Sequence, residues 1–162
     1  MSERTAQGRS ASASGVARAS IEHTWAVAQP ITPVGFYPRF GPIPATVDVR
    51  DQTGDWQSAG QTRTLMLADG GWVVETTKVV ERPAFFAYEL TDFQKLFGVL
   101  VDHARAEWTF TAVGDGTRID WTYTFFPKPR CGLAVSLIVA LFWSRYMTSV
   151  LPGIIAEVER GA

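Results

Sequence analysis

Two neighbouring segments in the second half of the chain alternate between apolar and polar side chains. They are residues 104–113 and 117–126, and the Gly114-Asp115-Gly116 sequence between them is typical of a tight hairpin turn. A two-residue turn in either available register brings the apolar side chains of both segments to one face and the polar ones to the other. The apolar face then holds Ala106, Trp108, Phe110, Ile119, Trp121, Tyr123 and Phe125. Such a hairpin predicts a sheet with one face in water and one face that another part of the chain must cover.

The stretch that follows the hairpin, residues 131–150, is the candidate to cover that face. Its first part, residues 131–143, has almost no polar side chain, and no strand punctuation occurs after Gly132. A membrane-spanning helix needs about 20 apolar residues. The shorter run here is closed by Arg145, so we expect no transmembrane segment. We expect instead a long helix laid across the sheet, which Pro152-Gly153 kinks or interrupts.

The predicted helix is apolar nearly all round in its first half. Leu133, Leu137 and Leu141 fall on one stripe at helical spacing, which we take as the core-facing side. The apolar residues then left over on the other side are Ile138, Val139 and Trp143. Three alternatives stay open for what covers these residues. They are the proline-rich loop, another subunit, and transient contact with a membrane surface.

The rest of the chain divides into short elements. Four further strand-like segments are residues 45–52, 61–68, 72–80 and 84–90. Before them, Ser20 can cap a short helix that Pro30 ends, and four prolines between residues 31 and 44 predict a loop. Residues 10–17, SASASGVA, fit a first strand and also fit flexible low-complexity sequence. We expect a flexible tail at residues 1–8 and a single domain at residues 9–162.

Composition excludes several classes of function. The net charge is -1 and no basic tract occurs, so nucleic acid is not an expected partner. Cys131 is the only cysteine, which fits a reducing compartment such as the cytoplasm, and the N-terminus has no secretory apolar core. Two scattered histidines and one cysteine cannot form a zinc site at a recognised spacing. No phosphate loop or dinucleotide fingerprint is present, so we expect neither a metal nor a cofactor.

Three segments together resemble a known superfamily. They are IEHTWAVA (residues 21–28), GQTRTLMLADGGWVVETTKVVERPAFFAYEL (residues 60–90) and AEWTFTAVGDGTRIDWTYTFFPKP (residues 106–129). They resemble the helix-grip superfamily, which comprises START domains, the birch-allergen (Bet v1-like) group, and the polyketide cyclase/dehydrase and lipid-transport (SRPBCC) family. The resemblance implies an α+β fold in which a curved antiparallel sheet wraps around a long C-terminal helix. It also implies a cavity that binds lipids, polyketides or other apolar molecules.

The covered face of the sheet supplies the candidate ligand pocket. Its residues are Phe86, Tyr88, Trp108, Phe110, Trp121, Tyr123 and Phe125, joined by Phe142 and Tyr146 from the helix. The tyrosines matter most, because each offers a hydroxyl at the end of an apolar body. The alternative is that these rings pack against one another and leave no void.

Arg63 and Glu75 lie on the two arms of a predicted hairpin. A three-residue loop makes them face each other, whereas a two-residue Asp69-Gly70 turn puts them on opposite faces. Facing inward, they could bind a polar group of a ligand or assist proton transfer. A structural ion pair or a solvent-side position is the alternative. The catalytic residues are unknown, and Arg63 is a candidate by resemblance alone. His103 is expected on the wet face.

The sequence therefore predicts reversible binding of a hydrophobic small molecule or lipid-like ligand, with transport of that ligand as a further role. The loop at residues 34–44 and the segment at residues 92–102 are expected to gate the cavity. One alternative is a cofactor-independent polyketide cyclase, aromatase or dehydratase. A second is a structural or interaction protein that dimerises through its apolar C-terminal helix. Both a monomer and a homodimer are compatible with the sequence.

Overall fold

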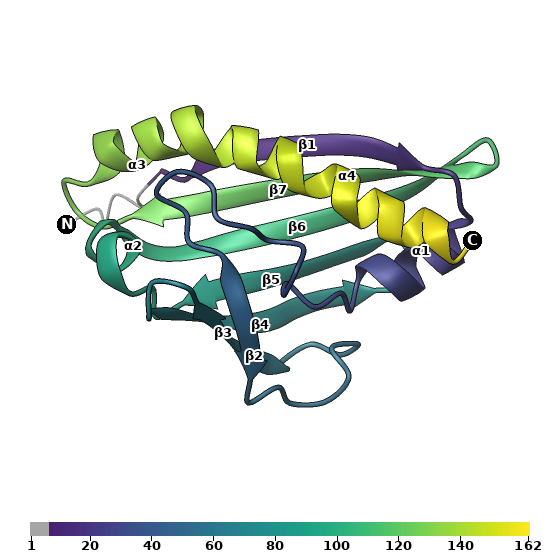
Figure 1. Ribbon diagram of the computed structural model, residues 1–162, viewed down its shortest axis with the longest axis horizontal. Helices are drawn as coiled ribbons and strands as arrows, with labels where there is room; N and C mark the ends of the chain where they lie inside the picture. The colour runs from purple at the N-terminus through teal and green to yellow at the C-terminus, as the bar shows by residue number, and fades with distance from the viewer. Residues whose placement is uncertain (1–6) are drawn as a thin grey trace, which may run out of the picture.

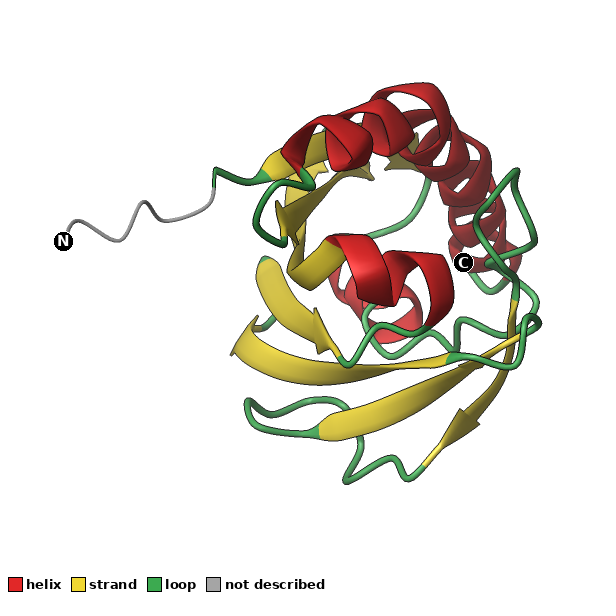
Figure 2. Cartoon of the chain, turned by 90° about the vertical axis from the view of Figure 1, so that its left-hand side faces the viewer, coloured by secondary structure: helices red, strands yellow, loops and turns green. Residues whose placement is uncertain are grey.

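A seven-stranded antiparallel sheet curves around a long C-terminal helical run in the computed structural model, which describes residues 7–162 (Figures 1 and 2). The strand order is β1-β7-β6-β5-β4-β3-β2. The strands are β1 (Arg9–Ala17), β2 (Thr46–Arg50), β3 (Thr62–Leu67), β4 (Trp72–Glu81), β5 (Phe85–Thr91), β6 (Val101–Val113) and β7 (Gly116–Pro127). The predicted α+β helix-grip fold is confirmed. The predicted tail at residues 1–8 lies almost wholly outside the described residues.

The hairpin of β6 and β7 has the predicted register. Val113 pairs with Gly116, so Gly114 and Asp115 form a two-residue turn, with Gly114 at φ 61°. Trp108 pairs with Trp121, and both rings are buried. The alternation of apolar and polar residues therefore decided which face of the sheet carries the core.

The helices are α1 (Ile21–Ala28), α2 (Lys95–Leu100), α3 (Gly132–Ile138), the π-helical turn η1 (Val139–Trp143) and α4 (Ser144–Arg160). The last three form one uninterrupted run across the sheet (Figure 1). Pro152 lies inside α4, so the predicted interruption there is wrong. The proline costs the helix one hydrogen bond, but Leu151 and Ile154 beside it are fully buried, and their packing holds α4 together.

The face of this run that meets the sheet is the opposite of the predicted one. Leu133, Leu137 and Leu141 are 75%, 52% and 49% exposed, whereas Val139 and Trp143 are buried. The Trp143 ring lies 4.9 Å from Tyr123 and 4.8 Å from Phe125, between ring centroids. An indole against an aromatic sheet removes more apolar surface from water than a leucine does, which favours this orientation.

β1 is a regular strand rather than flexible sequence. Its serines Ser10, Ser12 and Ser14 hydrogen bond across to Thr124, Thr122 and Asp120 on the wet face of β7. The alternate residues Ala11 and Ala13 are buried. Pairing with β7 therefore supplies the strand stability that the intrinsic preferences of serine and alanine lack.

Candidate functional site

An apolar cavity of about 70 Å³ lies between the sheet, α2, the proline-rich loop and the start of α4. The proline-rich loop and β2 contribute Pro33, Tyr37, Ile43, Pro44 and Thr46. The β3–β4 hairpin contributes Leu65, Leu67, Asp69, Val73 and Glu75. The remaining walls are Tyr88, Leu90, Phe93, Gln94, Phe97, Tyr123, Trp143 and Tyr146. Both segments predicted to gate the cavity thus contribute to its lining.

All 4 tyrosines of the chain line this one cavity. They are Tyr37, Tyr88, Tyr123 and Tyr146. Burial is the largest cause that raises the pKa of each phenol above its ordinary value, and neighbouring phenols or the Glu75 carboxylate raise most of them further. The four hydroxyls are therefore neutral hydrogen-bond donors and acceptors at any physiological pH.

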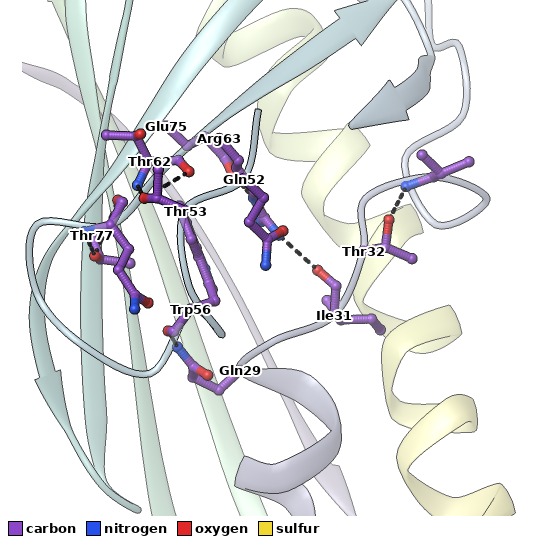
Figure 3. A network of polar contacts seen from close by, with 12 residues as sticks. Gln29, Ile31, Thr32, Gln52, Thr53, Trp56, Thr62, Arg63, Glu75 and Thr77 are labelled. Carbon is purple, nitrogen blue, oxygen red and sulfur yellow. Dashed lines mark hydrogen bonds and ion pairs between the residues drawn. The ribbon is translucent and has the colours of Figure 1, made fainter. Parts of the chain in front are cut away.

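Arg63 and Glu75 form a buried ion pair on the β3–β4 hairpin (Figure 3). The Arg63 Nε atom lies 2.6 Å from Glu75 Oε2, and the two side chains are 5% and 4% exposed. Burial lowers the pKa of the guanidinium, but attraction to Glu75 more than offsets this and leaves that pKa raised. Glu75 is part of the cavity lining, while Arg63 lies behind it.

The loop length brings these two charges together. Met66 pairs with Trp72, and the Leu67 N–H donates to the Gly71 carbonyl, so three residues form the loop. Gly70 takes φ 84°, a left-handed conformation that glycine adopts without steric cost. The three-residue alternative is therefore the correct one, and Arg63 stands directly opposite Glu75.

The loop between β2 and β3 closes the far side of the ion pair, which sequence reasoning did not predict. Trp56 is buried there at φ 67°, and the Arg63 guanidinium lies 4.2 Å from its ring centroid. The Gln29 Nε2 atom donates to the Trp56 carbonyl at 2.6 Å, and Arg63 Nη1 donates to the Ile31 carbonyl at 3.4 Å (Figure 3). No local sequence signal marks Trp56, because its position depends on contacts with distant elements.

Much of the predicted pocket lies outside the cavity lining. The residues concerned are Phe86, Trp108, Phe110, Trp121, Phe125 and Phe142. Trp25 from α1 packs edge-on against Phe86 at 5.7 Å and Phe110 at 5.6 Å, and Trp108 stacks on Trp121 at 4.7 Å. Phe86 and Phe110 fill the end of the core beneath α1, whereas Phe125 packs against Phe97 and Trp143 at the other end. Tyr88, Tyr123 and Tyr146 are the predicted aromatic residues that do border the cavity.

The histidines lie away from the cavity. His103 stacks on Phe126 at 4.3 Å and contacts the Asp102 carboxylate at 2.7 Å on the wet face. His23 contacts the Val158 carbonyl at 2.9 Å. Within residues 7–162, no three His, Cys, Asp or Glu side chains gather in a way that could hold a metal ion.

The short helix α2 forms one wall of the cavity. It has only six residues, none of them buried, and among the described residues no side chain caps its N-terminus. Asp92 before it and its first residue, Lys95, have φ values of 59° and 56°, which are unusual for residues other than glycine. Phe93 and Phe97 still point into the cavity.

Comparison with solved structures identifies the fold. Norcoclaurine synthase from Thalictrum flavum, in complex with dopamine and hydroxybenzaldehyde, shares 12% identity at a TM-score of 0.68, over 98% of this chain and 90% of that one. XoxI from Bacillus cereus shares 12% identity at a TM-score of 0.63, over 95% and 99%. Ara h 8.0201 shares 11% identity at a TM-score of 0.57, over 96% and 97%. At such low identity, the likeness shows the fold alone.

Comparison of sequences identifies the family. No curated protein matches the chain significantly. The family described as polyketide cyclase / dehydrase and lipid transport matches residues 9–159, which is nearly the whole chain. The resemblance inferred from the hairpins and the apolar helix is therefore confirmed. The chain belongs to the polyketide cyclase/dehydrase and lipid transport family.

Proposed function

We propose that this protein reversibly binds a small hydrophobic molecule in the cavity between the sheet and the C-terminal helix. The observation that carries the proposal is the gathering of all 4 tyrosines and Glu75 around one largely apolar cavity. A core selected only for packing would not need four phenols and a buried carboxylate facing one void. Apolar walls supply affinity, and a few polar groups set the orientation of the ligand.

The lining also indicates the chemistry of the ligand. Arg63 neutralises Glu75, and the tyrosine pKa values are raised, so the buried lining residues carry no net charge. The exposed Asp69 adds one carboxylate to the lining. Among residues 7–162, the buried indole N–H of Trp143 finds no acceptor, and it adds another donor at the cavity wall. A neutral molecule with carbonyl or phenol oxygens on an apolar ring skeleton matches this surplus of donors. The bound dopamine and hydroxybenzaldehyde of norcoclaurine synthase are ligands of that size on the same fold.

The size of the cavity requires that it opens. Its volume of about 70 Å³ is below the ~300–1,000 Å³ typical of pockets that hold drug-sized ligands. Outward movement of α2 would carry Phe93 and Phe97 away from the cavity and enlarge it. The proposal therefore includes a gate at α2, and it keeps the predicted cytoplasmic location.

A second candidate function is a cofactor-independent cyclase or dehydratase. The observation in its favour is the Glu75 carboxylate, which faces the cavity with Tyr88 beside it as a further proton donor. Arg63 would act by holding Glu75 in place, since it lies behind that residue. Loss of turnover with retained ligand binding in Glu75→Gln would support this function, and full turnover in that variant would remove it.

Native mass spectrometry of the gently purified protein tests the binding proposal. A stoichiometric apolar adduct, recovered by solvent extraction, is the expected result. The matched variant is Val73→Phe, which places a larger side chain in the cavity wall and should lose the adduct while staying folded. A clean apo mass, with no uptake from a panel of small aromatic carbonyl and phenol compounds, would contradict the proposal.

A further inference from the structure

The outer surface of α2, α3 and η1 carries an exposed apolar patch that neither the core nor the cavity uses. The patch consists of Leu133, Leu137 and Leu141, which are 75%, 52% and 49% exposed, together with Leu96 and Val99, which are 49% and 68% exposed. The three leucines follow one another at intervals of four residues along the helix, so they form a continuous ridge. We refer to these five residues as the leucine patch.

The two helices that carry the patch are neighbours in space. The Lys128 N–H donates to the Leu100 carbonyl at 2.9 Å, and Cys131 Sγ lies 3.9 Å from the Val99 carbonyl. The ring centroids of Phe97 and Trp143 lie 6.2 Å apart. Both helices therefore lie at the end of the molecule that faces the viewer in Figure 2. The exposed residues of α2 and the leucines of the long helix therefore lie at the same end of the molecule.

The charges around the leucine patch have mostly one sign. No aspartate or glutamate occurs between Trp121 and Ala156 in the sequence. Exposed cations border the patch, and they are Lys95, Lys128, Arg130 and Arg145. Three acids lie nearby: Asp92 and Asp102 near the two ends of α2, where Asp102 contacts His103, and Asp69, which lies close to Lys95. An apolar surface bordered by cations is complementary to a surface that combines hydrocarbon with negative charge.

We propose that the leucine patch docks this protein onto an anionic lipid surface. A second copy of the chain fits less well, because symmetric contact through α3 and η1 would bring cations against cations with no acid on either helix face to pair with them. Exposed leucines inserted among headgroups, with Lys and Arg near anionic phosphates, stabilise binding at a membrane surface. The patch thus lies on the bilayer without crossing it.

The packing of the helix determines this orientation. The run Gly132–Arg160 is long and apolar enough to cross a membrane by length and composition alone, a test that a core helix also passes. Here Val135, Val139 and Trp143 are buried against the sheet. A spanning helix would have to expose these residues to lipid and leave the aromatic face of the sheet without cover. Only the outer side of the run is free to meet a membrane.

Vesicle co-sedimentation tests the proposal, with vesicles of phosphatidylcholine alone or mixed with phosphatidylglycerol. We expect binding to the mixed vesicles that weakens as salt is added. The double variant Leu137→Gln/Leu141→Gln should lose about tenfold or more of the binding, because two apolar side chains no longer enter the interface. Arg130→Gln/Arg145→Gln should lose the preference for phosphatidylglycerol.

The chain offers a closely matched control. Val16 and Val113 are 54% and 48% exposed, and they lie at the β6–β7 hairpin end of the sheet, far from α3 (Figure 1). Val16→Gln/Val113→Gln removes similar apolar exposure and should bind vesicles like the wild type. Circular dichroism checks that each variant is folded.

Three results would overturn the proposal. The first is no binding of the wild type to either kind of vesicle. The second is equal loss of binding in the leucine and valine double variants, which would show that no particular surface is involved. The third is a dimer in light scattering that Leu137→Gln/Leu141→Gln converts to a monomer, since a second copy would then cover the patch. None of these measurements depends on whether the cavity binds a ligand.

Discussion

Arg63 and Glu75 are 12 residues apart in the sequence, and their side chains meet at 2.6 Å in the interior. Removing one partner of such a pair leaves an uncompensated buried charge, which costs far more than the pair contributes. We expect Glu75→Gln to lower the free energy of unfolding by about 3–5 kcal/mol. The double variant Arg63→Met/Glu75→Leu should recover most of that loss, because both charges are removed together. Urea denaturation measures both values.

An exposed ion pair in the same sheet provides the control for this prediction. Lys78 Nζ lies 3.8 Å from Glu89 Oε1, with side chains 41% and 35% exposed. Water screens this pair, so Glu89→Gln should cost less than about 1 kcal/mol. Equal losses in Glu75→Gln and Glu89→Gln would show that the Arg63–Glu75 pair is not buried in solution.

The cavity tyrosines predict an unusual alkaline titration. The pKa of all four phenols is raised, with burial as the largest cause. In the unfolded chain, a phenol loses its proton at a pH of about 10. Above that pH the native state therefore binds more protons than the unfolded state, so stability falls as the pH rises.

Ultraviolet absorbance of phenolate checks this titration. The folded protein should show no phenolate when the pH first passes about 10, and the signal of 4 tyrosines should appear together with unfolding. In denaturant, the same signal should appear at the ordinary pKa. A reversible signal from a fraction of the tyrosines, with circular dichroism unchanged, would mean that some of the four are open to water.

The orientation of the long helix leads to opposite expectations for two of its residues. Trp143 packs on Tyr123, Phe125 and Tyr146, so Trp143→Ala should cost about 3–5 kcal/mol of stability. Leu137 is 52% exposed, and Leu137→Ala should change stability by no more than about 0.5 kcal/mol. Thermal unfolding of the two variants measures both losses of stability. A larger loss in Leu137→Ala than in Trp143→Ala would place the leucine ridge in the core.

Gly116, the first residue of β7, lies close to the backbone of β1, and a substitution there tests this close approach. A Cβ atom added at Gly116 would lie 2.8 Å from the Ala17 carbonyl oxygen, which belongs to the backbone and cannot rotate away. We expect Gly116→Ala to cost about 1–3 kcal/mol, since the strands must separate. At Gly71 the contacts of an added Cβ are with side chains at 3.0 Å, which can adjust, so Gly71→Ala should cost less. Denaturant midpoints compare the two.

Local sequence patterns were sufficient to predict most of the sheet. The hairpin of β6 and β7 could be placed residue by residue, because its period of two and its turn chemistry both act over short distances. The same holds for α1, where the Ser20 side chain accepts from the His23 N–H at its N-terminus. Whether Arg63 faces Glu75 depends on the length of the loop between their strands. The sequence allowed both a two-residue and a three-residue loop, so it could not decide this pairing.

Features that depend on distant contacts could not be predicted in this way. The long helix is apolar on both sides, so its spacing favoured the stripe of Leu137, and only the contacts with the sheet put Trp143 in the core instead. Tyr37 reaches the cavity from a loop whose path has no periodic signal. Trp25 packs against Phe86 and Phe110, so these two rings, which were predicted to line the pocket, lie in the filled core instead. In each case the deciding contact joins elements far apart in the chain.

The pairing of β1 with β7 joins strands from opposite ends of the chain. Ser12 lies opposite Thr122, which comes 110 residues later. Among the described strands, β1 lies at the edge of the sheet and pairs only with β7. On the ribosome, β1 is therefore synthesised long before its partner strand. Its serines and alanines have a weak intrinsic preference for strand structure, so β1 is not expected to form without β7. The first strand to be synthesised is the last to be paired. Until β7 emerges, the nascent chain cannot complete its sheet, and assembly is delayed until most of the protein has been translated.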